Sequence, residues 1–169
     1  KIPQALLLTA TATPTVIADM QAKFAIAEAD VITTGFYRAN LNLWVEPVSG
    51  AAKRQRLVQW MGQRIGQPSI VYVTLQKTAE HIAQHLNQHG ISANAYHAGL
   101  PHEQREGIQR QFMGGQLNCM VATIAFGMGI DKPDVRFVAH TDLPKSMEGY
   151  YQETGRAGRD GEPAEAWLC

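Results

Sequence analysis

The sequence predicts an α/β fold in which a parallel β-sheet is covered by helices on both faces. Short apolar runs, typical of buried strands, alternate along the chain with longer amphipathic segments, typical of helices. Glycine or proline separates most of these segments. Strands that alternate with helices are joined by right-handed crossovers, which place the strands parallel to one another.

The predicted elements follow from this pattern in chain order. They are a strand at 5–8, helices at 14–24 and 52–65, a strand at 70–73, a helix at 78–90, a strand at 93–96, a helix at 101–113, strands at 119–122 and 135–139, a helix at 146–154 and a strand at 164–168. Thr13 followed by Pro14 predicts the first helix start, and Thr78 is a second candidate cap. Gly90 suits a helix end because glycine readily adopts a positive φ.

Apolar residues at helical spacing predict which faces are buried. The helix at 52–65 carries four of them on one face: Leu57, Trp60, Met61 and Ile65. The tryptophans are expected in the core or at a contact between lobes: Trp44, Trp60 and Trp167. Cys119 lies in a predicted strand, so we expect it to be an inert core residue.

The composition is that of one globular domain. The chain has 169 residues, of which 45% are hydrophobic and 18% charged, enough to bury a core. No apolar run approaches the roughly 18 residues of a membrane span, so no membrane partner is expected. Two cysteines are too few for a disulfide scaffold or a four-cysteine zinc site. They favour a reducing compartment, and we expect the bacterial cytoplasm or nucleoid rather than the nucleus.

Three histidines recur every four residues on one predicted helix, at His81, His85 and His89. This spacing can bind a metal. The apolar stripe of the same helix directs the histidines toward solvent, and no Cys or carboxylate accompanies them except Glu80. We therefore predict no metal site.

Ligands of parallel α/β sheets bind at the carboxyl ends of the strands. Two segments there carry chemistry. Residues 152–161 place Arg156 and Arg159 three apart among glycines. On one helical turn they share a face that suits a polyphosphate, because guanidinium groups bind phosphate oxygens in pairs. The spacing equally fits two surface arginines in a glycine-rich loop.

The second segment, residues 122–131, is a strand followed by Gly127, Gly129 and Asp131. A dinucleotide-binding fingerprint needs a third glycine where Lys132 stands, so that function is disfavoured. The glycines permit close approach of a ligand, and Asp131 can accept from a ribose or order the waters of a metal. On spacing alone a plain strand-to-loop turn is favoured.

Four segments occur in the order and spacing of one family: 8–13, 96–100, 122–131 and 152–161. From about residue 5 to residue 167 the chain resembles the second RecA-like lobe of RecQ-family DNA helicases, in helicase superfamily 2. The runs Phe126-Gly127-Met128-Gly129-Ile130-Asp131 and Gln152-Glu153-Thr154-Gly155-Arg156-Ala157-Gly158-Arg159 are its most specific motifs. The resemblance implies a single lobe over residues 1–169, within a longer chain whose first lobe lies upstream of Lys1.

The resemblance also implies site residues. Those implied to face ATP bound on the other lobe are Gln152, Arg156, Arg159, Gly129 and Asp131. Arg159 is the best candidate for the arginine finger, with Arg156 beside it. Those implied to contact the DNA backbone are Thr74, His97, Ala98, Gly99 and Thr123. Those implied in coupling are Thr9, Thr11 and Arg38, the last in a segment that also holds Phe36 and Asn40.

The sequence contains no Gly-x4-Gly-Lys-Ser/Thr motif and no Asp-Glu-x-His or Asp-Glu-x-Asp motif. By the resemblance, ATP and Mg²⁺ are bound mainly by the first lobe, and this chain alone is expected to be inactive. The implied partners are that lobe and DNA, as a single strand and a duplex junction, with 3′-to-5′ translocation and unwinding. Gln76 stands where the family usually has Arg, so that Arg role is not carried over.

Two alternatives stay open: a lobe of a related RNA helicase or duplex translocase, and a non-catalytic nucleic-acid-binding module. The formal net charge is zero, from 15 basic and 15 acidic residues. This excludes DNA binding through bulk positive charge. It permits a grip through hydroxyls and backbone N–H groups, and we expect the lobe alone to bind DNA weakly.

Overall fold

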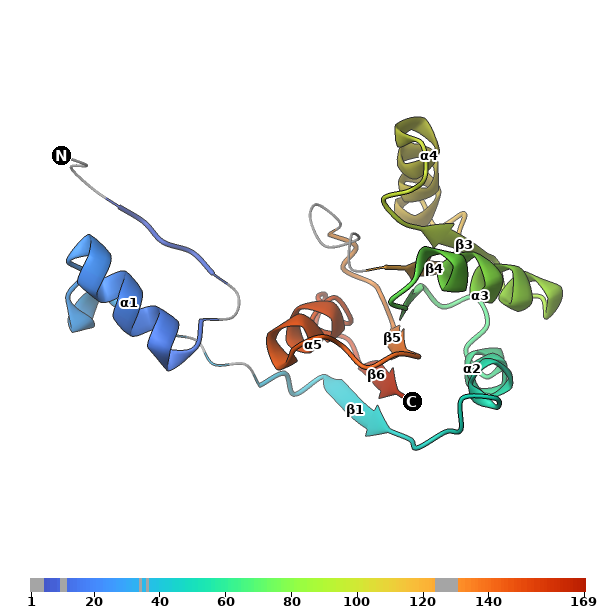
Figure 1. The fold of residues 1–169 in the computed structure, drawn as a ribbon, viewed down its shortest axis with the longest axis horizontal. Coiled ribbons are helices and arrows are strands. Elements are labelled where there is room, and N and C mark those ends of the chain that lie inside the picture. The colour runs from blue at the N-terminus through green and yellow to red at the C-terminus, as the bar shows by residue number, and fades with distance from the viewer. Residues whose placement is uncertain (1–4, 10–11, 34, 36, 124–130) are drawn as a thin grey trace. The chain divides into compact units, whose positions relative to one another are not determined.

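The computed structural model describes residues 5–9, 12–33, 35, 37–123 and 131–169 (Figure 1). It divides the chain into two compact units, residues 1–38 and 39–169, and each is described by itself. Of the residues named above, Lys1, Thr11, Phe36 and those at 126–130, which include Gly127 and Gly129, lie outside the described residues. The assignment of residues 1–169 to one lobe stays a prediction.

The first unit contains helix α1 (Pro14–Phe24) and the short 3-10 helix η1 (Glu28–Asp30). The start of α1 is confirmed, because Thr13 Oγ1 accepts from the N–H of Val16 at 3.3 Å and Pro14 occupies the first turn. The predicted strand at 5–8 is wrong. These residues are not in a strand and Leu8 is 84% exposed, because no described strand pairs with them. An apolar run alone does not make a strand without a neighbour for its backbone.

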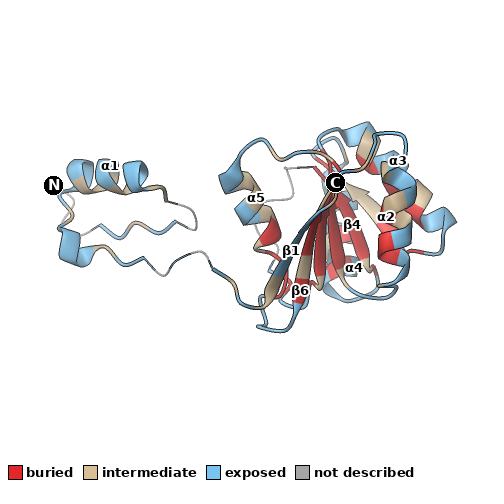
Figure 2. Cartoon of the chain, turned by 90° about the horizontal axis from the view of Figure 1, so that it is seen from below, coloured by how far each residue is buried: buried red, intermediate tan, exposed pale blue. Residues whose placement is uncertain are grey.

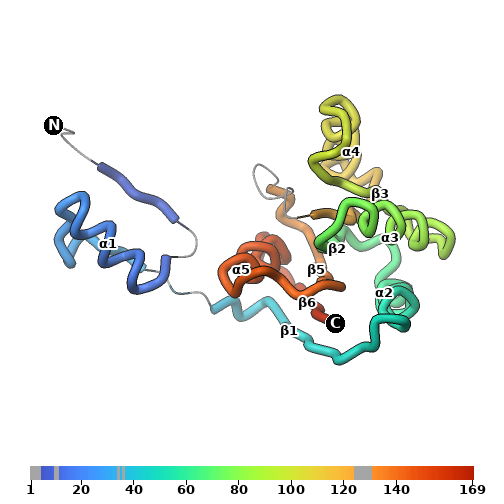
Figure 3. The backbone as a smooth tube through the Cα atoms, in the orientation of Figure 1, coloured from blue at the N-terminus to red at the C-terminus, as the bar shows by residue number. Residues whose placement is uncertain are grey.

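The second unit is built on a six-stranded sheet whose strands all run parallel, in the order β1-β6-β5-β2-β4-β3 (Figure 1). The strands are β1 (Leu41–Val45), β2 (Ser69–Tyr72), β3 (Ala93–Tyr96), β4 (Cys119–Ala122), β5 (Phe137–His140) and β6 (Ala164–Leu168). The predicted fold class is confirmed. The tube in Figure 3 follows the chain from edge strand β1 to β6, its partner in the sheet.

Helices cover both faces of this sheet. They are α2 (Lys53–Gly62), α3 (Gln76–Gln88), α4 (His102–Met113) and α5 (Met147–Thr154). The buried residues of α2 and α3 pack in one core cluster, and those of α4 pack in the other. Figure 2 shows the buried strands as a red layer with helices of half-buried and exposed residues outside it.

Aromatic rings fill the core between α2 and the sheet. Trp60 stacks on Trp167 with centroids 5.1 Å apart and meets Phe137 edge-on at 4.9 Å. Cys119 is fully buried, and burial raises the pKa of its thiol to about 12, so the prediction of an inert core cysteine is confirmed. Trp44, on edge strand β1, is 55% exposed within the described structure.

Several details differ from the sequence expectations. Strand β1 was missed, because four of its five residues are exposed and it lacks the pattern of a half-buried strand. Helix α2 ends at Gly62, so Ile65 lies in the following turn and is exposed. Helix α3 begins at Gln76 rather than after Thr78, since the carbonyl of Leu75 already accepts from Ala79. Strand β5 begins two residues later than predicted.

Candidate nucleotide and DNA site

The strand register brings four loops to one edge of the sheet. Tyr72 at the end of β2 pairs with Ala122 of β4 and with His140 of β5, and Ala122 pairs with Tyr96 of β3. The residues that directly follow these strand ends therefore share one edge. His97 and Thr123 are the first residues after their strands, and Thr74 and Asp142 are the second, so all four lie at this edge.

Thr74 is exposed and bonded to a residue that the sequence did not single out. Its backbone N–H and its hydroxyl both donate to Asp142 Oδ2, at 2.8 and 2.9 Å. A paired N–H and O–H at one position is an arrangement that also holds a phosphate oxygen. Asp142 follows β5, a strand that the sequence predicts, but nothing in its spacing predicts this contact.

His97 is turned inward. Its ring is buried, and Nε2 lies 3.2 Å from Glu80 Oε1 on α3. The exposed residues of this loop are Ala98 and Gly99. A Cβ at Gly99 would overlap the side-chain oxygen of Gln76, so Gln76 packs directly against the loop.

Thr123 follows β4 and is largely buried, at 8% exposure. Its N–H donates to the carbonyl of Tyr96 at 3.2 Å, which ties the end of β4 to the loop that begins at His97. The adjoining residues 124–130 lie outside the described structure.

The two arginines occupy different environments in the turn after α5. Arg159 is partly exposed and donates to Asp131 Oδ1 at 2.7 Å and to the carbonyl of Gly155 at 3.3 Å. Arg156 is only 8% exposed. Gln152 lies on the exposed side of α5. The structure therefore brings Arg159 and Asp131 together, and it exposes Arg159 rather than Arg156 to solvent.

The structure also contains a buried polar cluster around His140, which the sequence did not predict. His140 Nε2 lies 2.7 Å from Glu153 Oε2, and its ring stacks on Tyr72 at 5.2 Å. Burial raises the pKa of the Tyr72 hydroxyl, and the positive charge of Arg156 partly offsets that rise. The sequence does place His140 at the end of an apolar strand. It does not show that its partner, Glu153, lies on another element.

Asn40 and Arg136 fix the turn that carries Arg159. The Asn40 side-chain N–H groups donate to the carbonyls of Gly158 and Glu162, both at 2.8 Å. Arg136 bonds Asp160 at 2.5 Å, and this bond holds the pKa of the Asp160 carboxyl below its usual value. Gly158 has φ +60°, which only glycine adopts without strain. This gives Asn40 a structural role that its motif did not reveal.

The coupling residues fall outside this unit. Thr9 and Arg38 belong to the first unit, so their role stays a prediction. Among the described residues no three His, Cys, Asp or Glu side chains converge as in a metal site. His81 on α3 and His89 just after it are exposed, and His85 is half-buried with its ring 4.5 Å from that of His89. No described helix has the length and hydrophobicity to span a membrane.

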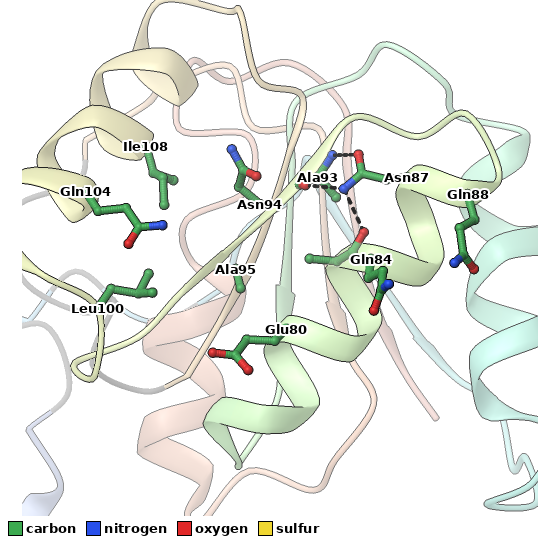
Figure 4. Close-up of a pocket in the computed structure, with 11 residues that line it drawn as sticks. Glu80, Gln84, Asn87, Gln88, Ala93, Asn94, Ala95, Leu100, Gln104 and Ile108 are labelled. Carbon is green, nitrogen blue, oxygen red and sulfur yellow. Dashed lines mark hydrogen bonds between the residues drawn. The ribbon is translucent and has the colours of Figure 1, made fainter.

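Beyond this edge, a groove of about 660 Å³ runs between α3, α4 and the edge strand β3 (Figure 4). Apolar residues and Glu80 line it together with five amide side chains: Gln84, Asn87, Gln88, Asn94 and Gln104. The Asn87 side chain accepts from the N–H of Ala93 at 3.1 Å and donates to its carbonyl at 2.7 Å. Asn87 thereby covers part of the open strand edge.

Comparison with known proteins identifies the family of this chain. The helicase conserved C-terminal domain matches residues 52–161. The chain is 46% identical over 158 residues to the RecQ-like DNA helicase blm-1 of Caenorhabditis elegans, and 42% identical over 166 residues to the ATP-dependent DNA helicase RecQ of Bacillus subtilis. These alignments cover 93% and 98% of this chain but only 16% and 28% of the relatives, so the chain spans less than a third of their length.

Solved structures agree with the fold. Saccharomyces cerevisiae Dbp5 bound to RNA and ADP BeF3 superposes with a TM-score of 0.79 at 25% identity, over 95% of this chain and 43% of that one. The Escherichia coli DEAD-box protein SrmB, bound to regulator of ribonuclease activity A, superposes with a TM-score of 0.69 at 27% identity, over 78% of each chain. The chain therefore belongs to the helicase conserved C-terminal domain family, with the sequence characteristics of the RecQ-family DNA helicases.

Proposed function

We propose that this chain is the C-terminal motor lobe of an ATP-dependent DNA helicase. The observation that carries the proposal is the exposed Arg159, held by Asp131 on a turn that Asn40 and Arg136 fix in place. The relatives named above as DNA helicases, one of them ATP-dependent, support it. In this proposal the lobe completes an ATP site whose main part lies on another lobe.

The side chains at the turn suit phosphate oxygens. Arg159, Arg156 and Gln152 offer N–H donors, whereas Mg²⁺ requires oxygen ligands. We assign ATP and Mg²⁺ binding mainly to the other lobe, and to Arg159 the contact with the transferring phosphoryl group. Arg159 then exchanges its bond with the Asp131 carboxylate for one with phosphate. Such a finger contributes about 10³–10⁵ in rate, or roughly 4–7 kcal/mol.

DNA is proposed to lie along the carboxyl edge of the sheet. Thr74, Thr123 and the backbone of Ala98 and Gly99 offer neutral donors there. ATP binding would close the two lobes and hydrolysis would reopen them, moving these contacts along one strand in the 3′-to-5′ direction and unwinding the duplex.

Replacing Arg159 tests the proposal. In the full-length protein, Arg159→Ala should lower DNA-stimulated ATPase at least a hundredfold while the affinity for a fluorescent ATP analogue changes little. Arg110→Ala is the matched control, because that side chain is 75% exposed on α4 with its carboxylate partner at 3.9 Å. Wild-type turnover in Arg159→Ala would refute the finger assignment.

A second candidate is a motor that acts on RNA, favoured by the superposition on Dbp5 bound to RNA. Stimulation of the ATPase by single-stranded DNA and by RNA of the same sequence separates the two. Absence of any ATPase from the full-length protein would instead favour a non-catalytic binding module.

A further inference from the structure

The end of β5 is joined to α5 through a buried histidine. His140 is 1% exposed and its Nε2 lies 2.7 Å from Glu153 Oε2. Tyr72 stacks on the ring at 5.2 Å and Tyr150 contacts it at 5.1 Å. Nδ1 has no hydrogen-bond partner among the described residues. Nε2 therefore carries the proton in this contact and donates it to the Glu153 carboxylate.

The same segment is joined to the loop after β2 only two residues later. Asp142 Oδ2 accepts from both donors of Thr74. Between these contacts the carbonyl of Thr141 accepts from Lys53 Nζ on α2 at 2.6 Å. Lys53 also donates to the carbonyl of Cys169 at 2.8 Å. Residues 140–142 thus include the end of β5, and they are bonded to α5, to the loop after β2 and to α2.

We propose that His140 and Asp142 are positioning residues that couple the ATP-facing turn to the DNA-facing loop. The proposal rests on the proposed function. A DNA phosphate that takes the N–H and O–H of Thr74 has to displace the Asp142 carboxylate, because one pair of donors serves either anion and the two anions repel each other.

Displacement of Asp142 moves the strand end that carries His140. The ring is enclosed by Tyr72 and Tyr150 and bonded to Glu153, so its movement is passed to α5. Glu153 directly follows Gln152 and precedes Arg156 by three residues. DNA occupancy at Thr74 is thereby converted into a shift of the arginines.

A matched pair of variants at Glu153 tests the link in the full-length protein. Glu153→Ala removes the acceptor for His140, whereas Glu153→Gln keeps one. We expect Glu153→Ala to lower the stimulation of ATPase by single-stranded DNA at least tenfold. The basal ATPase and the Kd for a fluorescent oligonucleotide should change less than threefold, and Glu153→Gln should keep its stimulation within threefold of wild type.

Asp142→Asn is the second test, because it changes the side chain that bonds the exposed Thr74 on the DNA-facing loop. It should also lower stimulation, and the double variant with Glu153→Ala should be no worse than the more impaired single variant, since both interrupt one path. If a thermal melt shows that Glu153→Ala does not fold, His140→Gln and Asp142→Asn test the proposal instead. His140→Gln keeps a hydrogen-bond donor near the position of Nε2 and should retain the stimulation of ATPase by DNA.

Unchanged stimulation in Glu153→Ala and Asp142→Asn, equal loss of basal and stimulated rates, or multiplied effects in the double variant would overturn the link. Each of these results requires an active wild type. A wild-type protein without DNA-stimulated ATPase would overturn the proposed function itself, together with this inference.

Discussion

Gly158 decides whether the arginine turn can form. Its φ is +60°, and a Cβ there would lie 2.6 Å from Asn40 Nδ2 and 2.8 Å from both the Ala164 Cβ and the Glu162 carbonyl oxygen. Two of these neighbours are parts of the main chain or directly attached to it, so they cannot move aside as a flexible side chain would. The same glycine offers its carbonyl to Asn40, which couples local conformation to the tertiary contact.

Gly158→Ala should therefore destabilise the protein by about 2–4 kcal/mol, from left-handed strain and overpacking together. Chemical denaturation measures the change. Gly62→Ala is the control, because Gly62 closes α2 and a Cβ at that position would meet nothing within 4 Å. This control substitution should be neutral or stabilise by up to about 1 kcal/mol. Equal effects of the two substitutions would contradict the packing argument.

At the scale of elements, the turn after α5 and the start of β5 form one supported unit. Arg136, just before β5, bonds Asp160 and also donates to the carbonyls of Asp134 and Pro163. The Asp160 carboxylate further accepts from the N–H of Glu162 at 3.1 Å. These contacts let a turn without regular secondary structure hold Arg159 in one place.

The Arg136–Asp160 pair should give a pH-dependent contribution to stability. The bond to Arg136 lowers the pKa of Asp160 in the folded protein. The contribution is therefore complete above the ordinary Asp pKa of about 3.9 and is lost as the pH falls through the lower folded value. Solvent around this exposed carboxyl keeps the effect small.

Thermal unfolding of wild type and Asp160→Asn measures this contribution. The difference in Tm should be present at pH 7 and should shrink progressively as the pH is lowered below the ordinary Asp pKa of about 3.9. Arg136→Gln should remove the same increment, and the double variant should lose little more than either single one. A Tm difference that is independent of pH would show that the charge on Asp160 contributes nothing.

At the scale of the whole molecule, the zero net charge is accompanied by pairing of its basic residues. Arg56 bonds Glu46 and Arg64 bonds Glu165, each at 2.6 Å, while Lys53 is directed to backbone carbonyls. The basic stretch near α2 therefore presents less free charge than its sequence suggests. The donors at the proposed DNA edge, Thr74 and Thr123, are neutral.

The isolated chain should accordingly bind single-stranded DNA weakly and hydrolyse no ATP above background. Fluorescence anisotropy over a salt series should give a slope of log K against log salt shallower than about −1.5, equivalent to two charged phosphate contacts at about −0.7 each. Tight binding with a steep salt dependence, or ATP turnover by a clean preparation, would contradict the proposed division of work between lobes.

Most of the second unit could be predicted from its sequence, because buried strands and amphipathic helices have characteristic spacings of apolar residues along the chain. Strand β1 escaped because it lies at an exposed edge, and residues 5–8 misled because they look like a strand but have no strand partner. The arginine turn was visible because Arg156, Gly158 and Arg159 are local in sequence.

The sequence by itself determined the parallel α/β fold, the family and the position of the arginine motif, since each depends on neighbouring residues or on regular spacing. Only the tertiary structure decided that Arg159 is exposed while Arg156 is buried, that His97 turns inward, and that Asp142 bonds Thr74 while Glu153 bonds His140. The reason is physical: these contacts join side chains from different elements, and no local pattern records which distant group a polar side chain will meet once the sheet is assembled.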